Sequence, residues 1–253
     1  VYFQYFDPAD ENGRALLPAI REILNANDHM DQIVANIRGM SFGRLRIGTF
    51  ASASVLWLPK IIEEFSHDYP GIQIEIIVGG NDSLISQLDE SCIDFAIMSN
   101  PPQGYEWIHL ASDRMLVLLP PGHRLVDKDR VTLDEIDDDP FILSNEGFDY
   151  DVSQIIKGSG ITPRLSFSTM ENRGIIAMIQ HGLGVTVMPE MVLDSLESNV
   201  ITKELAPCEY RHMGIIVKSV HTASLAAKTF ISYAKRIISE LGTYPPIDGE
   251  LNA

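Results

Sequence analysis

The amino-acid sequence predicts an α/β protein in which one long helix precedes two similar α/β halves. The helix is predicted by apolar residues that recur every three or four positions between residues 13 and 38. Each half is predicted by strand-like alternation that gives way repeatedly to helical periodicity, first over residues 45–98 and again from residue 115 onward. Strands and helices that alternate in this order imply a parallel sheet with right-handed crossovers.

The long helix carries a heptad pattern. Its apolar positions are spaced alternately by four and three residues, and only one polar residue interrupts them. These positions are Leu16, Ile20, Ile23, Asn27, Met30, Val34 and Ile37. A helix that packs on its own domain usually has a wider apolar stripe, so the narrow seam favours a partner helix and dimerisation. Packing within the same domain is the alternative.

The first half is predicted to run strand, helix, strand, helix, strand. Leu45, Ile47 and Thr49 alternate with charged or small residues, as in a strand with one buried face. Ser52 and Ser54 stand where the following helix needs an N-cap. The predicted elements are a strand at 45–49, a helix at 55–65, a strand at 72–78, a helix at 84–88 and a strand at 95–98.

The second half repeats this order and ends in additional elements. Its strands are predicted at 115–119, 141–143, 165–168, 185–188 and 214–217, and its helices at 131–138, 152–158, 175–181, 190–196 and 224–241. Two such halves, with the chain passing from one to the other, suggest a cleft between them.

The composition argues against DNA binding by this chain itself. Its 253 residues carry a formal net charge of −16, and no cluster of five or more Lys or Arg occurs. A DNA-binding surface needs Lys and Arg to replace the counterions of the phosphates. Cys92 and Cys208 form no CxxC motif or disulfide framework, so we expect two buried thiols in a cytoplasmic protein. We find no apolar run that would span a membrane and no signal peptide.

Motifs of catalysis and cofactor binding are missing from the sequence. There is no GxxxxGK[ST] loop, no GxSxG elbow, no HExxH pair and no Cys/His cluster. Gly182 and Gly184 form part of a GxGxxG pattern, but they precede a predicted strand instead of following one. Residues 137–139 are three consecutive Asp, which we interpret as a solvated turn. We therefore expect no enzyme activity, no cofactor and no metal.

Small polar residues recur where predicted strands end and helices begin. In open α/β sheets, ligands bind beyond the carboxyl ends of the strands, near helix N-termini. Any one of these sets is explained by helix capping alone. Their recurrence in both halves favours a shared ligand cleft. The sets are Ser52/Ser54, Gly80/Asn81, Ser99/Asn100, Ser144/Asn145 and Thr169/Asn172.

Several ordered motifs resemble the effector domain of LysR-type transcriptional regulators. The first is Ile47-Gly-Thr-Phe-Ala-Ser52, followed by Leu58-Pro59 and Tyr69-Pro-Gly-Ile72. Four further motifs along the chain match the same family: Ile93-Asp-Phe-Ala-Ile97, Leu118-Leu-Pro-Pro-Gly-His123, Pro140-Phe-Ile-Leu143 and Gly182-Leu-Gly-Val185. Gly13-Arg-Ala-Leu-Leu-Pro18 is similar to the start of the family's dimerising linker helix. Arg124 departs from the family pattern, which has proline after Gly-His.

The resemblance implies an architecture and a function. The family has a winged helix-turn-helix, a linker helix and two Rossmann-like subdomains similar to type 2 periplasmic binding proteins. We expect the linker at 1–40, subdomain I at 41–112 with 219–243, and subdomain II at 113–218, without the winged helix-turn-helix. The chain would bind a small-molecule inducer between the subdomains, act as a homo-oligomer through the linker and the regulatory domain, and reach DNA only through the missing domain.

The resemblance also implies which residues touch the effector. They are Ser52, Ala53, Ser54, Gly80, Asn81, Met98, Ser99, Ser144, Asn145, Met170, Glu171, Asn172, Val185 and Thr186. Asp82 and Glu171 oppose a simple preference for organic anions, whereas Arg173 favours one. The rival interpretation is a solute-binding protein of a transporter, which shares the fold but should lack the heptad helix.

Overall fold

The computed structural model describes residues 42–100, 103–144, 150–169, 171–196 and 200–244. Before residue 42 it describes seven positions, all of them helical: Leu16, Ala19, Ile20, Ile23, Asn27, Met30 and Val34. The predicted seam therefore lies on a helix, except for Ile37, which is outside the described residues. The side chains of Leu16, Ile23 and Met30 are more than half exposed in the single chain.

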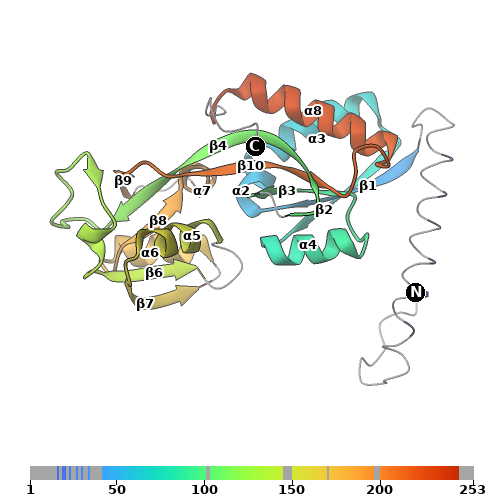
Figure 1. The fold of residues 1–253 in the computed structure, drawn as a ribbon. Coiled ribbons are helices and arrows are strands. Elements are labelled where there is room, and N and C mark those ends of the chain that lie inside the picture. The colour runs from blue at the N-terminus through green and yellow to red at the C-terminus, as the bar shows by residue number, and fades with distance from the viewer. Residues whose placement is uncertain are drawn as a thin grey trace.

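The first lobe is built on a sheet with the strand order β2-β1-β3-β10-β4 (Figure 1). Its strands are β1 (Gly43–Thr49), β2 (Ile72–Val78), β3 (Phe95–Ser99), β4 (Glu106–Leu119) and β10 (Tyr210–Val217). Strands β1, β2 and β3 are parallel, as the sequence predicts. Strand β10 runs antiparallel to both β3 and β4.

Helices cover both faces of this sheet (Figure 1). They are α2 (Ala51–Leu56), α3 (Leu58–Asp68), α4 (Asn81–Asp89) and α8 (Leu225–Leu241). Helices α3 and α8 share one core, in which the rings of Phe65 and Phe230 lie 5.2 Å apart between centroids. Helix α4 packs on the other face through Leu84 and Leu88. Amphipathic helices thus bury both sides of the central strands, as parallel sheets require.

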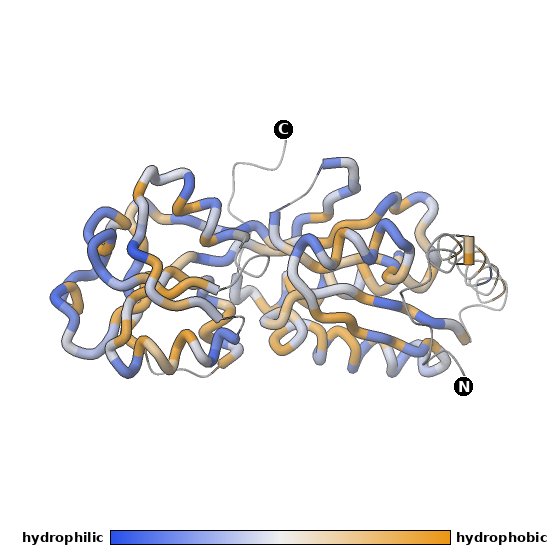
Figure 2. The backbone as a smooth tube through the Cα atoms, turned by 90° about the horizontal axis from the view of Figure 1, so that it is seen from below, coloured by the Kyte–Doolittle hydropathy of each residue, from blue (hydrophilic) through white to orange (hydrophobic). Residues whose placement is uncertain are grey.

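The second lobe continues from the distal half of β4. That half pairs antiparallel with β8 (Thr186–Pro189) and β9 (Ile201–Leu205), and β9 pairs with β5 (Arg130–Val131). Strands β6 (Pro140–Ser144) and β7 (Arg164–Thr169) form a parallel pair beside them. The helices are η1 (Asp134–Ile136), α5 (Tyr150–Ser159), α6 (Asn172–Gln180) and α7 (Glu190–Leu196). Hydrophobic segments run through both lobes (Figure 2).

The lobes are joined where β4 leaves the first sheet and β10 enters it. Arg114 and Tyr210 are register partners at this junction. The sequence-based division placed residues 113–218 in the second subdomain, whereas hydrogen bonds join β10 to β3 and β4 of the first sheet. The entry and the exit of the second lobe therefore lie side by side.

Several local predictions were wrong. Helix α2 begins at Ala51 with Phe50 as its N-cap, and no side chain caps it, so Ser52 and Ser54 are not the caps that we expected. Residues 131–138 hold the end of β5 and the short η1 instead of one helix. Strand β9 was missed because only its last residue is buried, which leaves little alternation to detect. Both cysteines are exposed, not buried.

The two glycines of the Gly-Leu-Gly motif have a backbone role. Gly182 has a φ of 76°, a left-handed conformation that disfavours other residues. A Cβ on Gly184 would lie 2.3 Å from the backbone oxygen of Pro140, the first residue of β6. The motif therefore permits the close approach of this turn to β6.

No helix among the described residues is long and apolar enough to cross a membrane.

Candidate functional site

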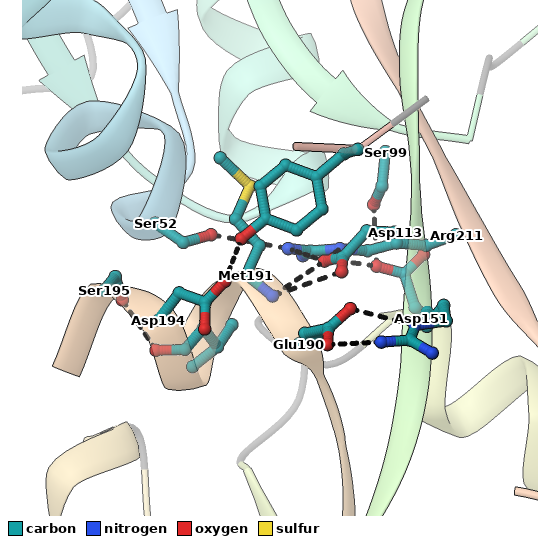
Figure 3. Close-up of polar contacts among 12 residues, drawn as sticks. Ser52, Ser99, Asp113, Asp151, Glu190, Met191, Asp194, Ser195 and Arg211 are labelled. Atoms are coloured by element: carbon teal, nitrogen blue, oxygen red, sulfur yellow. Dashed lines mark hydrogen bonds and ion pairs between the residues drawn. The ribbon is translucent and has the colours of Figure 1, made fainter. Parts of the chain in front are cut away.

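A buried arginine lies where the two lobes meet (Figure 3). Arg211 is the second residue of β10, and its side chain is 7% exposed. Its Nε and Nη2 donate to the carboxylate of Asp113 on β4, at 2.9 and 2.8 Å. Its Nη2 also lies 3.4 Å from Oγ of Ser52 on α2, and its guanidinium stacks over the ring of Phe50 at 4.9 Å from the centroid. Arg211 thus connects β10, β4 and the start of α2.

Asp113 is completely buried and is shared between two elements. Besides the guanidinium it accepts the backbone N–H of Met191, at the start of α7, at 3.1 and 3.3 Å. Three donor groups on one carboxylate compensate much of the cost of removing it from water. Burial nevertheless outweighs Arg211 and raises the pKa of Asp113 above its ordinary value. Because α7 packs on α2 and β4, Asp113 helps to hold this part of the junction together.

A second carboxylate reaches the junction from the other lobe. Asp151 lies in the first turn of α5, and it accepts hydrogen bonds from Ser99 Oγ at 2.8 Å and from Asn100 Nδ2 at 2.5 Å. Both donors stand at the end of β3 in the first lobe. Nη1 of Arg211 lies 4.0 Å from the same carboxylate. Burial, only partly opposed by Arg211 and Ser99, raises the pKa of Asp151.

The junction brings together polar residues that the sequence analysis selected from different strand ends. Ser52 and Ser99 are both buried and belong to the Arg211 and Asp151 contacts described above. Asn81, at the start of α4, donates from Nδ2 to the backbone oxygen of Ser99 at 3.0 Å. Three of the selected strand ends of the first lobe therefore converge at one place.

Other selected residues have different environments. Ala53, Met98 and Val185 are buried in hydrophobic clusters, and Thr186 is buried with its hydroxyl donating to the backbone oxygen of Ile142 at 2.6 Å. Four more selected residues have local structural roles: Ser54 donates to the Ala51 carbonyl, Gly80 caps α4, Glu171 caps α6, and Asn172 begins α6. Ser144 is buried at the end of β6. Asn145 and Met170 are not among the described residues.

Sequence reasoning missed Arg211, Asp113 and Asp151. The detectable signal was a charged residue beside the apolar stretch of a strand: Asp113 shortly precedes the apolar end of β4, and Arg211 stands at the start of β10. A buried charge needs a partner, so opposite charges in two such strands predict a pair. Nothing local in the sequence indicates that Asp151 would join them.

The described side chains of the junction can donate and accept hydrogen bonds and form ion pairs. The described residues contain no group of three or more side chains suited to a metal ion. A neighbouring hydroxyl, Ser112, lies between the rings of His212 at 3.0 Å and His109 at 3.3 Å. Ser112 is buried, and burial together with His212 lowers the pKa of His109. His109 and His212 are half-buried, and both contact Ser112 across the β4–β10 pair.

Comparison with known proteins agrees with this geometry. The family described as LysR substrate binding domain matches residues 38–238. YvbU, an HTH-type transcriptional regulator of Bacillus subtilis (strain 168), is 33% identical over 229 residues, which cover 90% of this chain and 78% of YvbU. The HTH-type transcriptional activator CmpR of Synechocystis sp. is 23% identical over 231 residues, which cover 88% of this chain and 75% of CmpR.

Solved structures show the same fold. The effector-binding domain of QuiR in complex with shikimate has a TM-score of 0.70 and 20% identity, and the alignment covers 79% of this chain and 99% of that domain. The BenM effector-binding domain with benzoate has a TM-score of 0.68 and 20% identity, and it covers 83% of this chain and 98% of that domain. With a family match over most of its length, this chain belongs to the LysR substrate-binding domain family and is the effector-binding domain of a LysR-type regulator.

Proposed function

We propose that this domain binds a small-molecule inducer at the junction between its lobes and transmits binding to a DNA-binding domain elsewhere in the parent protein. The observation that carries the proposal is the contact between residues of the two lobes at the junction. Arg211 and Ser99 of the first lobe both contact Asp151 of the second, and Arg211 also contacts Ser52. A ligand that contacts both lobes changes their relative orientation, because it binds one arrangement more tightly than another.

The role proposed is regulatory and not catalytic. Binding needs the hydrogen-bonding groups found here, whereas hydrolysis or group transfer needs an accessible nucleophile with a base. Solute capture for a transporter is the rival role. The apolar seam of Leu16, Ile23 and Met30 favours a regulator, because dimeric regulators need such a helix and monomeric solute-binding proteins do not.

The direct test is a thermal-shift screen of small organic acids, with shikimate and benzoate included because related domains bind them. A compound that binds only the native state raises the melting temperature with its concentration. Calorimetry of a hit with Ser52→Ala and Asn145→Ala then locates it: losing one hydrogen bond should weaken binding roughly 2- to 13-fold. Ser52→Trp should abolish binding by filling the junction. Unchanged affinity in all three variants would place the site elsewhere.

We also propose that the parent protein assembles through the seam helix and the regulatory domain. Light scattering of the wild type and of Ile23→Asp/Val34→Asp tests the first contact, because two charges on the seam should dissociate the dimer. A monomeric wild type at micromolar concentration would contradict dimerisation through the seam helix.

Assembly through the regulatory domain is supported by exposed apolar residues on the edge strands β2 and β7: Ile76, Val78, Leu165 and Phe167.

A further inference from the structure

Asp151 occupies a position that has the chemistry of a ligand-binding site. Its carboxylate comes from the second lobe, while a hydroxyl and an amide at the end of β3 donate to it and a guanidinium lies 4.0 Å away. Ser99, Asn100 and Arg211 all stand on strands of the first sheet or directly after one. Such a set of donors is how proteins commonly hold the carboxylate of a bound molecule.

We propose that Asp151 is an internal ligand: its carboxylate fills the position that a carboxylate of the effector takes when it binds. This inference rests on the proposed function and adds the chemical class of the effector and the residues that select it. Binding would displace Asp151 from Ser99 and Asn100. The displacement would release α5, and with it the second lobe, from the end of β3.

The charges of the junction require that a carboxylate of the effector replaces the carboxylate of Asp151 and does not bind beside it. Arg211 is already paired with Asp113 at 2.8 Å, and Asp151 is the second carboxylate beside the same guanidinium. Both carboxylates are largely buried, so holding their negative charge away from water is costly, and burial raises the pKa of each. A third carboxylate would raise that cost further. Replacing Asp151 leaves the net charge unchanged, so the remaining contacts of the effector decide its affinity.

The space beside Asp151 restricts the class further. A cavity of about 570 Å³ adjoins Asp151 and Asn100, between α5, η1 and the connection from β9 to β10. Its other charged lining residues are Asp134 and Glu209, and none of its lining side chains is Lys, Arg or His. A second anionic group directed into this cavity would meet repulsion. We therefore infer a monocarboxylate in preference to a dicarboxylate.

The test removes the carboxylate of Asp151 by substitution and supplies a small carboxylate in solution. Asp151→Ala removes the internal carboxylate and leaves the donors of Ser99, Asn100 and Arg211 in place. About 100 mM sodium acetate should then raise the melting temperature of Asp151→Ala by about 2–4 °C relative to sodium chloride at equal ionic strength. Malonate should raise it less than acetate. The wild type should not respond, because Asp151 already holds the position.

Two variants make the test specific. Asp134→Ala removes a carboxylate from the same cavity but no contact with Ser99 or Asn100, so acetate should not stabilise it. Ser99→Ala/Asp151→Ala lacks one donor and should respond to acetate less than Asp151→Ala does. An equal acetate response in all proteins, or none in Asp151→Ala, would overturn the proposal. If acetate stabilises Asp151→Ala but no compound in the thermal-shift screen stabilises the wild type, only the proposed effector function is contradicted. If a compound stabilises the wild type but acetate does not stabilise Asp151→Ala, only the role of Asp151 as an internal ligand is contradicted.

Discussion

Two arginines on adjacent strands of the junction each contact two carboxylates, yet their surroundings differ. Arg211 is 7% exposed and pairs with Asp113, which is fully buried. Arg114, which follows Asp113 on β4, is 47% exposed and lies 2.7 Å from Glu190 and 3.4 Å from Glu204. The charges, distances and strands are similar, so burial is the main difference. Removing the partner of a buried charge therefore leaves that charge uncompensated, whereas water replaces the partner of an exposed charge.

The largest effect should follow from Arg211→Met, which leaves Asp113 buried without its cation. We expect the free energy of unfolding to fall by about 3–5 kcal/mol, measured by urea denaturation monitored by circular dichroism. A loss below about 1 kcal/mol, the range of exposed pairs, would mean that burial does not separate the two arginines.

The double variant Arg211→Met/Asp113→Leu sharpens the same comparison. Removing both charges eliminates the uncompensated carboxylate, so the double variant should unfold at a higher urea concentration than Arg211→Met alone. Full recovery is not expected, because the backbone N–H of Met191 loses its acceptor. A double variant that is less stable than the single one would show that Asp113 matters for reasons other than its charge.

Asp151→Asn should alter how stability depends on pH. Burial raises the pKa of Asp151 in the folded protein above the ordinary value of 3.8, so the folded state binds a proton that the unfolded state does not within that window. As pH falls from neutral toward 3.8, the wild type should therefore gain stability relative to Asp151→Asn. Asp113 shifts in the same direction and is common to both proteins, so it cancels in the difference. Urea melts at several pH values measure this, and a constant difference would contradict it.

The smallest effect should follow from Arg114→Gln. Its ion pairs are exposed, so we expect a change of about 0–1 kcal/mol in the free energy of unfolding. That change should vanish in about 1 M NaCl, where the screening length is about 3 Å. Urea melts at low and high salt test both statements. A loss as large as that of Arg211→Met would remove the contrast between the two arginines.

The architecture could be predicted because each element carries its own local signal. Alternation gave the strands β1 and β2, a compact apolar run gave β3, and helical periodicity gave α3 to α8 to within a few residues. Elements with weak local signals failed: β9 buries one residue, and the expected helix at 131–138 was overridden by the pairing of Val131 with Leu205. Tertiary contacts decide such segments, and a single sequence does not reveal them.

Only some residues of the site could be predicted, because the others are brought together by tertiary contacts. Ser52 and Ser99 were found because strand ends in α/β sheets are known binding positions. Asp113 and Arg211 are 98 residues apart, and Asp151 is 52 residues from Ser99. A charge in each strand hints that Asp113 and Arg211 pair, but the place of Asp151 follows only from how the two lobes come together. Ala53, Met98 and Val185 stood at expected positions but are buried in apolar clusters.

The pairing of Arg114 with Tyr210 makes the second lobe an insertion in the first. The chain leaves the first sheet at one of these residues and returns at the other, on antiparallel strands that a short hairpin turn would close. A segment inserted in this way can be replaced without breaking any ladder of the β2-β1-β3-β10 part of the sheet, provided that the replacement keeps the contacts of α7 with Asp113 and α2. Evolution can therefore change the half that carries Asp151 while the half that carries Arg211, Asp113 and Ser52 stays constant.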